Sequence, residues 1–207
     1  MASLHAILDV ETAERAGWVP ADLAHAFLDG GATWIQIRAK RLSSAAFLEL
    51  CDAVVRHAEA HRATVIVNDR VDLALLSSAA GVHVGQDDLT PAAVRRLLGS
   101  GAIVGYSTHT TDQFEAALLE PVSYIAVGPV FGTSTKETGY EAVGLELVSA
   151  AAARAHGRPL VTIGGITLDR VPDVIAAGAS AVAVIADLLA GNDPAKRVAA
   201  YIRVLNV

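Results

Sequence analysis

The stretch Gly81-Val82-His83-Val84-Gly85-Gln86-Asp87-Asp88-Leu89-Thr90-Pro91-Ala92-Ala93-Val94-Arg95-Arg96-Leu97-Leu98 contains one complete strand–loop–helix unit. Its first part, Val82–Val84, is a short run bounded by glycines, which is typical of a buried strand. Thr90-Pro91 predicts a helix start, with a capping hydroxyl followed by proline in the first turn. The polar residues gather between the two elements, so the unit carries its chemistry where the strand ends.

The same unit recurs along all 207 residues. The expected strands are Leu4–Leu8, Thr33–Ile37, Thr64–Val67, Val82–Val84, Ile103–Tyr106, Tyr124–Val127, Leu160–Ile163 and Ala181–Ile185. The expected helices are Asp22–Asp29, Ser44–His61, Val71–Ser77, Pro91–Leu98, Thr111–Leu119, Leu145–His156, Leu168–Ala176 and Pro194–Val204. Eight alternations without a break in composition predict an α/β protein, a single (β/α)8 TIM barrel over residues 1–207. A doubly wound open sheet is the alternative, but no strand has the pattern of a polar edge.

Composition excludes several classes of function. Hydrophobic residues make up 53% of the chain and charged residues 18%, with no apolar run long enough to span a bilayer. The net charge of −6, without a basic stripe, argues against a nucleic-acid partner. The N-terminus lacks a signal-peptide pattern, and the single Cys51 excludes an intramolecular disulfide, so we expect a cytoplasmic protein. A homo-oligomer stays open, because no helix face is apolar enough to name an interface.

Polar residues stand at the end of the second strand. Strand alternation places Gln36, Arg38 and Lys40 on one side, facing the barrel mouth if the chain stays extended. Arg38 can clasp phosphate oxygens with its planar fork, and Lys40 adds a second charge. A salt-bridged arginine and a solvated lysine are the plain alternatives for each residue alone.

Carboxylates follow the next two strands. Asn68-Asp69-Arg70 ends the third strand, and Asp87-Asp88 follows the fourth. Asp69 with Asp87 or Asp88 could hold one Mg²⁺, which prefers oxygen ligands and completes its shell with water and substrate phosphate. Otherwise Asp69 pairs with Arg70 or caps a helix, and Asp88 is a turn residue.

The later strands supply hydroxyls, histidines and glycines. Ser107 follows the fifth strand and can donate to a phosphate or a reacting ring; His109 is either a general acid–base or a helix cap. His83, in mid-strand, is better explained as a satisfied core histidine. Backbone N–H groups after the seventh and eighth strands commonly bind phosphate in such barrels. The mouth is therefore expected to hold two anionic groups. The first would lie on Arg38, Lys40 and the Asp69–Asp88 metal, and the second on Gly165, the Ile185–Ala186 backbone and the hydroxyls of Thr133, Ser134 and Thr135; Lys136 could serve either.

Six motifs in order resemble the thiamine phosphate synthase family, from about Leu4 to the C-terminal helix. They are Gln36-x-Arg38-x-Lys40, Asn68-Asp69, Gly81-Val-His-Val-Gly-Gln-x-Asp88, Gly105-x-Ser107-x-His-Thr110, Gly128-Pro-x-x-x-Thr133-x-Thr135-Lys136 and Ile163-Gly-Gly-Ile166. Each motif is weak alone, and each falls at the end of an expected strand.

The resemblance implies an Mg²⁺-dependent transferase of thiamine biosynthesis with two phosphorylated small-molecule substrates. It joins 4-amino-2-methyl-5-hydroxymethylpyrimidine diphosphate to 4-methyl-5-(2-phosphoethyl)thiazole, and diphosphate leaves before the thiazole nitrogen attacks. The resemblance assigns Mg²⁺ to Asp69 and Asp88. It assigns the pyrimidine diphosphate to Gln36, Arg38, Lys40, Asn68, Ser107 and Lys136, with Arg38, Lys40, Ser107 and Lys136 acting in catalysis. It assigns the thiazole phosphate to Thr133, Ser134, Thr135, Gly165 and the Ile185–Ala186 backbone.

The sequence departs from the family at a few positions. Ala186 stands where serine is usual, His5 stands where an aromatic residue is common, and Glu137–Val143 is individual. A related thiazole tautomerase is the nearest rival, but it carries histidine where this chain has Pro129. A non-catalytic sensor of phosphorylated ligands is the third hypothesis, and the Asp69–Asp88 pair argues against it.

Overall fold

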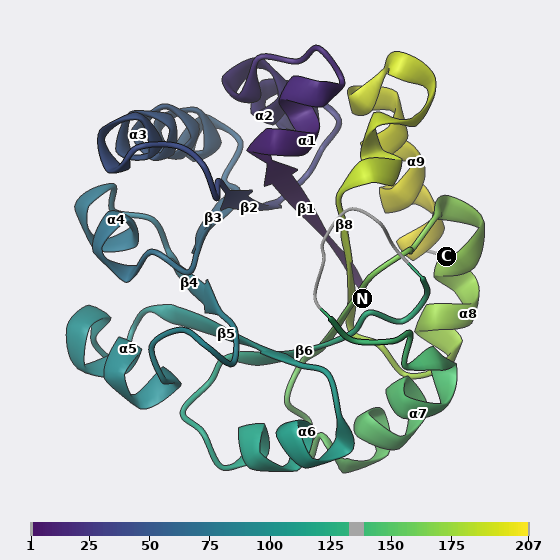
Figure 1. The fold of residues 1–207 in the computed structure, drawn as a ribbon. Coiled ribbons are helices and arrows are strands. Elements are labelled where there is room, and N and C mark those ends of the chain that lie inside the picture. The colour runs from purple at the N-terminus through teal and green to yellow at the C-terminus, as the bar shows by residue number, and fades with distance from the viewer. Residues whose placement is uncertain (1, 133–138, 207) are drawn as a thin grey trace.

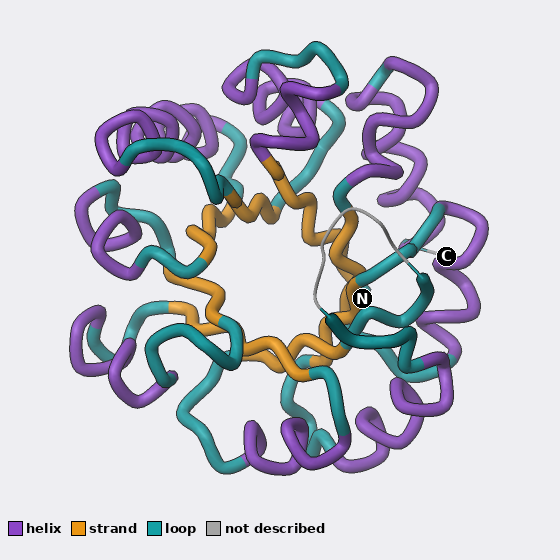
Figure 2. The backbone as a smooth tube through the Cα atoms, viewed as in Figure 1, coloured by secondary structure: helices purple, strands orange, loops and turns teal. Residues whose placement is uncertain are grey.

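Parallel strands form a closed barrel at the centre of the molecule. A computed structural model describes residues 2–132 and 139–206, and the described residues form eight strands that pair in sequence order, with β8 closing on β1. The strands are β1 (Ser3–Asp9), β2 (Trp34–Arg38), β3 (Thr64–Asn68), β4 (Gly81–Val84), β5 (Ile103–Thr108), β6 (Tyr124–Val127), β7 (Leu160–Ile163) and β8 (Ala181–Val184). Figures 1 and 2 show this ring of strands with the helices outside it. The predicted barrel is confirmed.

The helices alternate with the strands around the ring. They are α1 (Val10–Arg15), α2 (Pro20–Asp29), α3 (Ser44–Ala60), α4 (Val71–Leu76), α5 (Pro91–Leu98), α6 (Thr111–Leu118), α7 (Gly144–Arg154), α8 (Val171–Ala176) and α9 (Pro194–Leu205), with 3-10 helices at Leu168–Arg170 and Ala186–Asn192. The Thr90 hydroxyl accepts from the Ala93 N–H at 3.3 Å, so the predicted cap of α5 is present. None of the helices in the described chain is long and apolar enough to cross a membrane.

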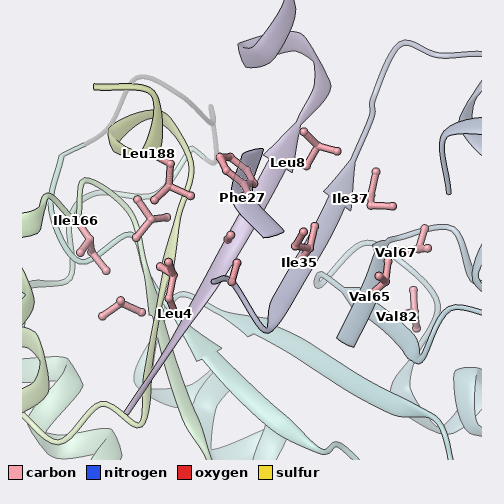
Figure 3. Packing of buried hydrophobic residues seen from close by; sticks show 14 of the residues in the cluster. Leu4, Leu8, Phe27, Ile35, Ile37, Val65, Val67, Val82, Ile166 and Leu188 are labelled. Atoms are coloured by element: carbon pink, nitrogen blue, oxygen red, sulfur yellow. The ribbon is translucent and has the colours of Figure 1, made fainter. Parts of the chain in front are cut away.

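Strand alternation divides the apolar side chains into two layers. Leu8, Ile35, Ile37 and Val67 belong to the outer layer between strands and helices (Figure 3). The second layer fills the barrel interior with Ile7, Tyr124, Ala126, Val161, Ala181 and Ala183. Apart from Tyr124, these interior side chains are small or medium in size, and this leaves space above them at the carboxyl ends of the strands.

Short elements at strand ends were missed. The prediction has no helix at Val10–Arg15, where β1 passes directly into α1 through the cap residue Asp9. The expected helix Leu168–Ala176 begins as a 3-10 turn and becomes α-helical at Val171. Both segments follow strands at the mouth of the barrel, where tertiary contacts determine the local geometry.

Candidate active site

A cavity of about 350 Å³ lies at the carboxyl ends of the strands. Every strand contributes to its wall. Seven of the predicted site residues line it: Gln36, Arg38, Asn68, Ser107, Gly165, Ile185 and Ala186. Three others, Lys40, Asp69 and Asp88, lie outside the lining. The predicted Thr133, Ser134, Thr135 and Lys136 lie outside the described residues.

Arg38 is held at the cavity wall by a buried carboxylate that the sequence did not single out. Asp9 lies beside Arg38 in the register of β1 and β2, and its Oδ2 accepts from Arg38 Nη1. Asp9 Oδ1 accepts from the N–H and the hydroxyl of Thr12, at 2.9 and 2.6 Å, and so caps α1. The Nε of Arg38 is buried and has no hydrogen-bond partner among the described residues. An anionic oxygen in the cavity would satisfy that donor.

Lys40 does not share the cavity wall with Gln36 and Arg38. Strand β2 ends at Arg38, and the chain then bends because Glu11 Oε1 accepts from the N–H groups of Lys40 and Arg41, at 2.7 and 2.9 Å. The alternation that placed Lys40 with the other two therefore ends before it reaches Lys40. Its ammonium instead forms an ion pair with Asp69 at the rim.

Asp69 and Asp88 form a pair of carboxyl groups at the same rim. Burial raises the pKa of Asp69; the Lys40 ammonium opposes this, and the neighbouring Asp88 carboxyl adds to it. Arg70 pairs with Asp72 rather than with Asp69, which removes the first alternative for Asp69. Asp88 Oδ2 accepts from the Gly85 N–H at 2.8 Å, so it also has the turn role that the sequence left open.

The backbone of Asp69 is strained. Its φ is +62°, which is uncommon for a residue other than glycine. The Asp69 N–H donates to the His83 carbonyl at 2.8 Å, and the Arg70 N–H donates to the Asn68 carbonyl at 2.7 Å. These bonds fix the backbone from which the Asp69 carboxyl group projects. Strain of this kind is concentrated at functional sites, and two preplaced carboxylates fit the oxygen preference of Mg²⁺.

A buried hydrogen-bonded chain crosses the interior below the mouth. His83 Nδ1 lies 2.9 Å from the Tyr124 hydroxyl, and His83 Nε2 lies 2.8 Å from Ser107 Oγ. His83 thus has the satisfied ring that the sequence predicts, yet it also lines the cavity. A Cβ at Gly105 would approach the Tyr124 ring to 2.1 Å and His83 Nδ1 to 2.4 Å. Glycine is therefore required in β5 for this chain to form.

His5 and Trp34 lie deeper in the barrel. Their rings stack with centroids 4.2 Å apart and an angle of 11°. Burial lowers the pKa of His5 to about 3, so the imidazole is neutral at physiological pH. His5 keeps the planar stacking surface expected of an aromatic residue here. The contact between His5 and Trp34 could not be predicted, because it joins two strands whose register has no local signal in the sequence.

His109 borders the cavity from the loop after β5. The cap of α6 is Thr110, whose hydroxyl accepts from the Gln113 N–H at 3.2 Å, so the helix-cap role expected as one alternative for His109 is wrong. His109 Nδ1 lies 2.5 Å from the Gly128 carbonyl oxygen, and its ring stacks on Tyr140 with centroids 4.1 Å apart. The ring therefore links the loops after β5 and β6.

The opposite wall is built from close-packed backbone. The Val130 N–H donates to the Ile163 carbonyl at 2.8 Å, and the Phe131 N–H donates to the Gly164 carbonyl at 3.0 Å. Gly165 has a φ of +62°, and a Cβ there would come within 2.6 Å of the Gly132 carbonyl. Glycine lets the loops after β6 and β7 lie against each other beside the cavity.

The loop after β8 is fixed from behind by Asp187. Its Oδ2 accepts from Arg197 Nη2 at 2.7 Å, from the Tyr201 hydroxyl, and from the Leu168 N–H at 3.2 Å. The preceding Ala186 lines the cavity with a methyl group, so a ligand oxygen there has backbone donors but no side-chain hydroxyl. This cluster was not predicted, because Arg197 and Tyr201 lie on α9, whose docking against the loop has no local signal in the sequence.

Comparison with known proteins identifies the family to which this barrel belongs. Residues 9–188 match the family described as thiamine monophosphate synthase. The chain belongs to that family. A thiamine-phosphate synthase from Acidothermus cellulolyticus is 37% identical over 202 residues, covering 97% of this chain and 94% of the relative. One from Chlorobium luteolum is 38% identical over 187 residues, covering 90% and 88%.

A solved structure agrees with the family assignment. The thiamine phosphate pyrophosphorylase from Pyrococcus furiosus superposes with a TM-score of 0.88 at 26% identity, covering 99% of this chain and 95% of that one. The thiamine monophosphate synthase match includes the whole of β2 to β8, and hence Arg38 and Ser107 of the cavity wall and Asp69 at its rim.

Proposed function

We propose that the cavity joins 4-amino-2-methyl-5-hydroxymethylpyrimidine diphosphate to 4-methyl-5-(2-phosphoethyl)thiazole, giving thiamine phosphate and diphosphate. The observation that carries the proposal is the division of one cavity into two unlike walls. Arg38, with Lys40 and the Asp69–Asp88 pair at the rim, forms a charged side. Small residues and glycine-backed loops of β6 to β8 form the other side, which would receive the second ring and its phosphate.

The charged side suits a leaving diphosphate. In the proposed reaction the bond between the pyrimidine methylene carbon and the diphosphate oxygen breaks, and that oxygen keeps the electron pair. The thiazole nitrogen then forms the new C–N bond with its lone pair, so no proton has to be removed. Arg38 and Lys40 bind the departing oxygens, which stabilises the negative charge that develops there. A strong general base is therefore not needed.

Asp69 and Asp88 would hold Mg²⁺. The metal would neutralise charge on the leaving group. The residue contacts support this assignment, since the two carboxyl groups already lie close enough for one to raise the pKa of the other. Lys40, which pairs with Asp69 at the rim, would bind the diphosphate oxygens.

Further residues of the cavity are assigned to the two proposed substrates in the same way. Gln36, Asn68 and Ser107 line the cavity and would bind the pyrimidine ring or its diphosphate. Gly165 and the Ile185–Ala186 backbone would bind the thiazole phosphate. The family resemblance adds Thr133, Ser134 and Thr135 to that phosphate and Lys136 to the diphosphate. We further propose a cytoplasmic enzyme, in keeping with the buried free thiol of Cys51.

The test is a direct assay of both products. Purified protein with both substrates and Mg²⁺ should release diphosphate and form thiamine phosphate; no product at saturating substrate would overturn the proposal. Asp69→Ala should remove most of the Mg²⁺-dependent turnover. Asp72→Ala is the matched control, because Asp72 is exposed, pairs with Arg70 and is not a member of the Asp69–Asp88 pair. Equal losses in the two variants would contradict the metal role of Asp69.

A further inference from the structure

A second group of metal-ligating side chains lies outside the cavity, where α2 and α3 end. Asp29 is the last residue of α2, His57 lies in the last turn of α3, and His61 follows that helix. One ligand atom from each of the three residues lies within 4.8 Å of the other two. His57 and His61 are four positions apart, which brings their rings to one face of the helix.

The Nε2 atoms of His57 and His61 are the ring nitrogens available to a metal ion. His61 Nδ1 lies 3.2 Å from the His57 carbonyl oxygen, which can only accept, so Nδ1 carries the proton and Nε2 has the lone pair. His61 Nε2 then points to Asp29 Oδ1 at 3.6 Å. His57 Nε2 is buried and has no hydrogen-bond partner among the described residues. Metal-bound histidines commonly donate their other N–H to a carbonyl in this way.

His25 orients the central ring of the group. It lies one turn before Asp29 on α2, and its ring packs on that of His57 with centroids 3.8 Å apart. The His57 and His61 ring centroids are 4.9 Å apart. The rings are thus held together before any ion binds, which lowers the entropic cost of binding.

The group of Asp29, His57 and His61 lies where helix dipoles favour a cation, and it lies apart from the active-site cavity. The carboxyl-terminal ends of two helices carry partial negative charge, and all three ligands lie at such ends. Helices run antiparallel to the strands, so these ends lie beside the amino ends of β2 and β3. The active-site cavity opens at the carboxyl ends of the strands, on the opposite side of the barrel.

We propose that Asp29, His57 and His61 bind a late first-row divalent cation, represented by Zn²⁺, that joins α2 to α3. Two imidazoles and one carboxylate are ligands that zinc takes, with a water molecule in the fourth position. Bonds of about 2.0–2.1 Å in a tetrahedron require ligand atoms about 3.4 Å apart. The observed separations of up to 4.8 Å are closed by rotation of the exposed Asp29 and the partly exposed His61 side chains. The site is distinct from the all-oxygen pair Asp69 and Asp88, which suits Mg²⁺.

The experiment is a Zn²⁺ titration of metal-stripped, tag-free protein in the presence of excess Mg²⁺, followed by calorimetry and thermal unfolding. We expect one high-affinity zinc per chain and a rise in Tm of about 5–10 °C at a free zinc concentration about 100-fold above Kd. Co²⁺ at the same site should show the intense visible bands of a tetrahedral complex. The variant His57→Ala with His61→Ala should lose the calorimetric binding, the Tm shift and the cobalt bands together.

Two control variants separate this site from zinc binding elsewhere on the surface and from binding at the cavity rim. His156→Asn changes an exposed histidine outside the group, and Asp69→Ala changes the proposed magnesium site; both should keep zinc binding within about twofold of the parent chain. The zinc proposal is overturned if the double histidine variant binds as tightly as the parent, or if the parent binds no zinc. Loss of binding in Asp69→Ala would place the ion at the rim of the cavity and would also overturn it.

Discussion

Asp9→Asn is the most informative single change at the cavity wall. It keeps the size of the side chain and the oxygen that caps α1 through the Thr12 N–H and hydroxyl. It removes the negative charge that faces Arg38 across β1 and β2. The substitution therefore isolates one interaction, the pairing of a buried carboxylate with a guanidinium whose side chain is only 13% exposed.

The magnitude follows from that burial. Removing one member of a fully buried ion pair costs about 3–5 kcal/mol, while a hydrogen bond to a charged group contributes about 1.5–3 kcal/mol. Because Arg38 keeps some contact with water, we expect a loss in the free energy of unfolding of about 2–3 kcal/mol. For a chain of this length that corresponds to a fall in Tm of about 5–10 °C. The kcat/KM for the proposed pyrimidine diphosphate should also fall about tenfold or more, since Arg38 loses its anchor.

Calorimetric unfolding of the wild type and the variant measures the first effect. Asp193→Asn is the matched control: Asp193 caps α9 through the Lys196 N–H at 3.1 Å and pairs with the exposed Lys196 ammonium. It undergoes the same chemical change at a solvated cap, and its Tm should stay at the wild-type value. If Asp9→Asn and Asp193→Asn shift Tm equally, the Asp9–Arg38 pair does not stabilise the wall as argued.

Three further predictions concern the interior and the rim. Tyr124→Phe removes the hydroxyl that faces His83 Nδ1 and should cost about 1–3 kcal/mol of unfolding free energy, measured by denaturant titration. Gly105→Ala forces a Cβ into Tyr124 and His83 and should cost at least about 1–3 kcal/mol, with activity lost; a wild-type Tm would contradict the packing. The affinity for Mg²⁺ should fall as the pH is lowered. Because the pKa of Asp69 is raised, protons compete with Mg²⁺ for its carboxylate at a pH above the ordinary aspartate pKa of about 3.9. An affinity that does not depend on pH would exclude Asp69 as a ligand.

Local sequence signals were sufficient to predict the eight strands of the barrel. Each strand is a short apolar run bounded by turn residues, and this pattern depends on burial on both faces rather than on a particular partner. The helix at Val10–Arg15 was missed for a physical reason as well. It has six residues, too few for a helical period, and it starts at Asp9 without a turn after β1. Only the capping bonds of Asp9 show that the chain changes its conformation there.

The lining of the cavity was predicted where a side chain's direction follows from strand alternation alone. Gln36 and Arg38 line the cavity for that reason. Asp9 was not found, because its contact with Arg38 depends on the register of β1 against β2, and that register is set by the whole closed barrel. Lys40 was misplaced because the strand had already ended and Glu11, distant in sequence, bends the chain.

The distribution of charge within the cavity favours one orientation of the proposed pyrimidine diphosphate substrate. Among the described residues that line it, Arg38 is the one permanent cation, and Lys40 with the two rim carboxyl groups stands above it. Deeper in the barrel, His5 has a pKa lowered to about 3 and stacks as a neutral ring on Trp34. A diphosphate therefore gains its interactions at the mouth and loses solvation if it moves inward, whereas an uncharged pyrimidine ring gains contact with the apolar floor. Charge at the mouth and apolar contact below it together orient the substrate of the proposed reaction, with its pyrimidine ring towards the barrel interior and its diphosphate at the rim.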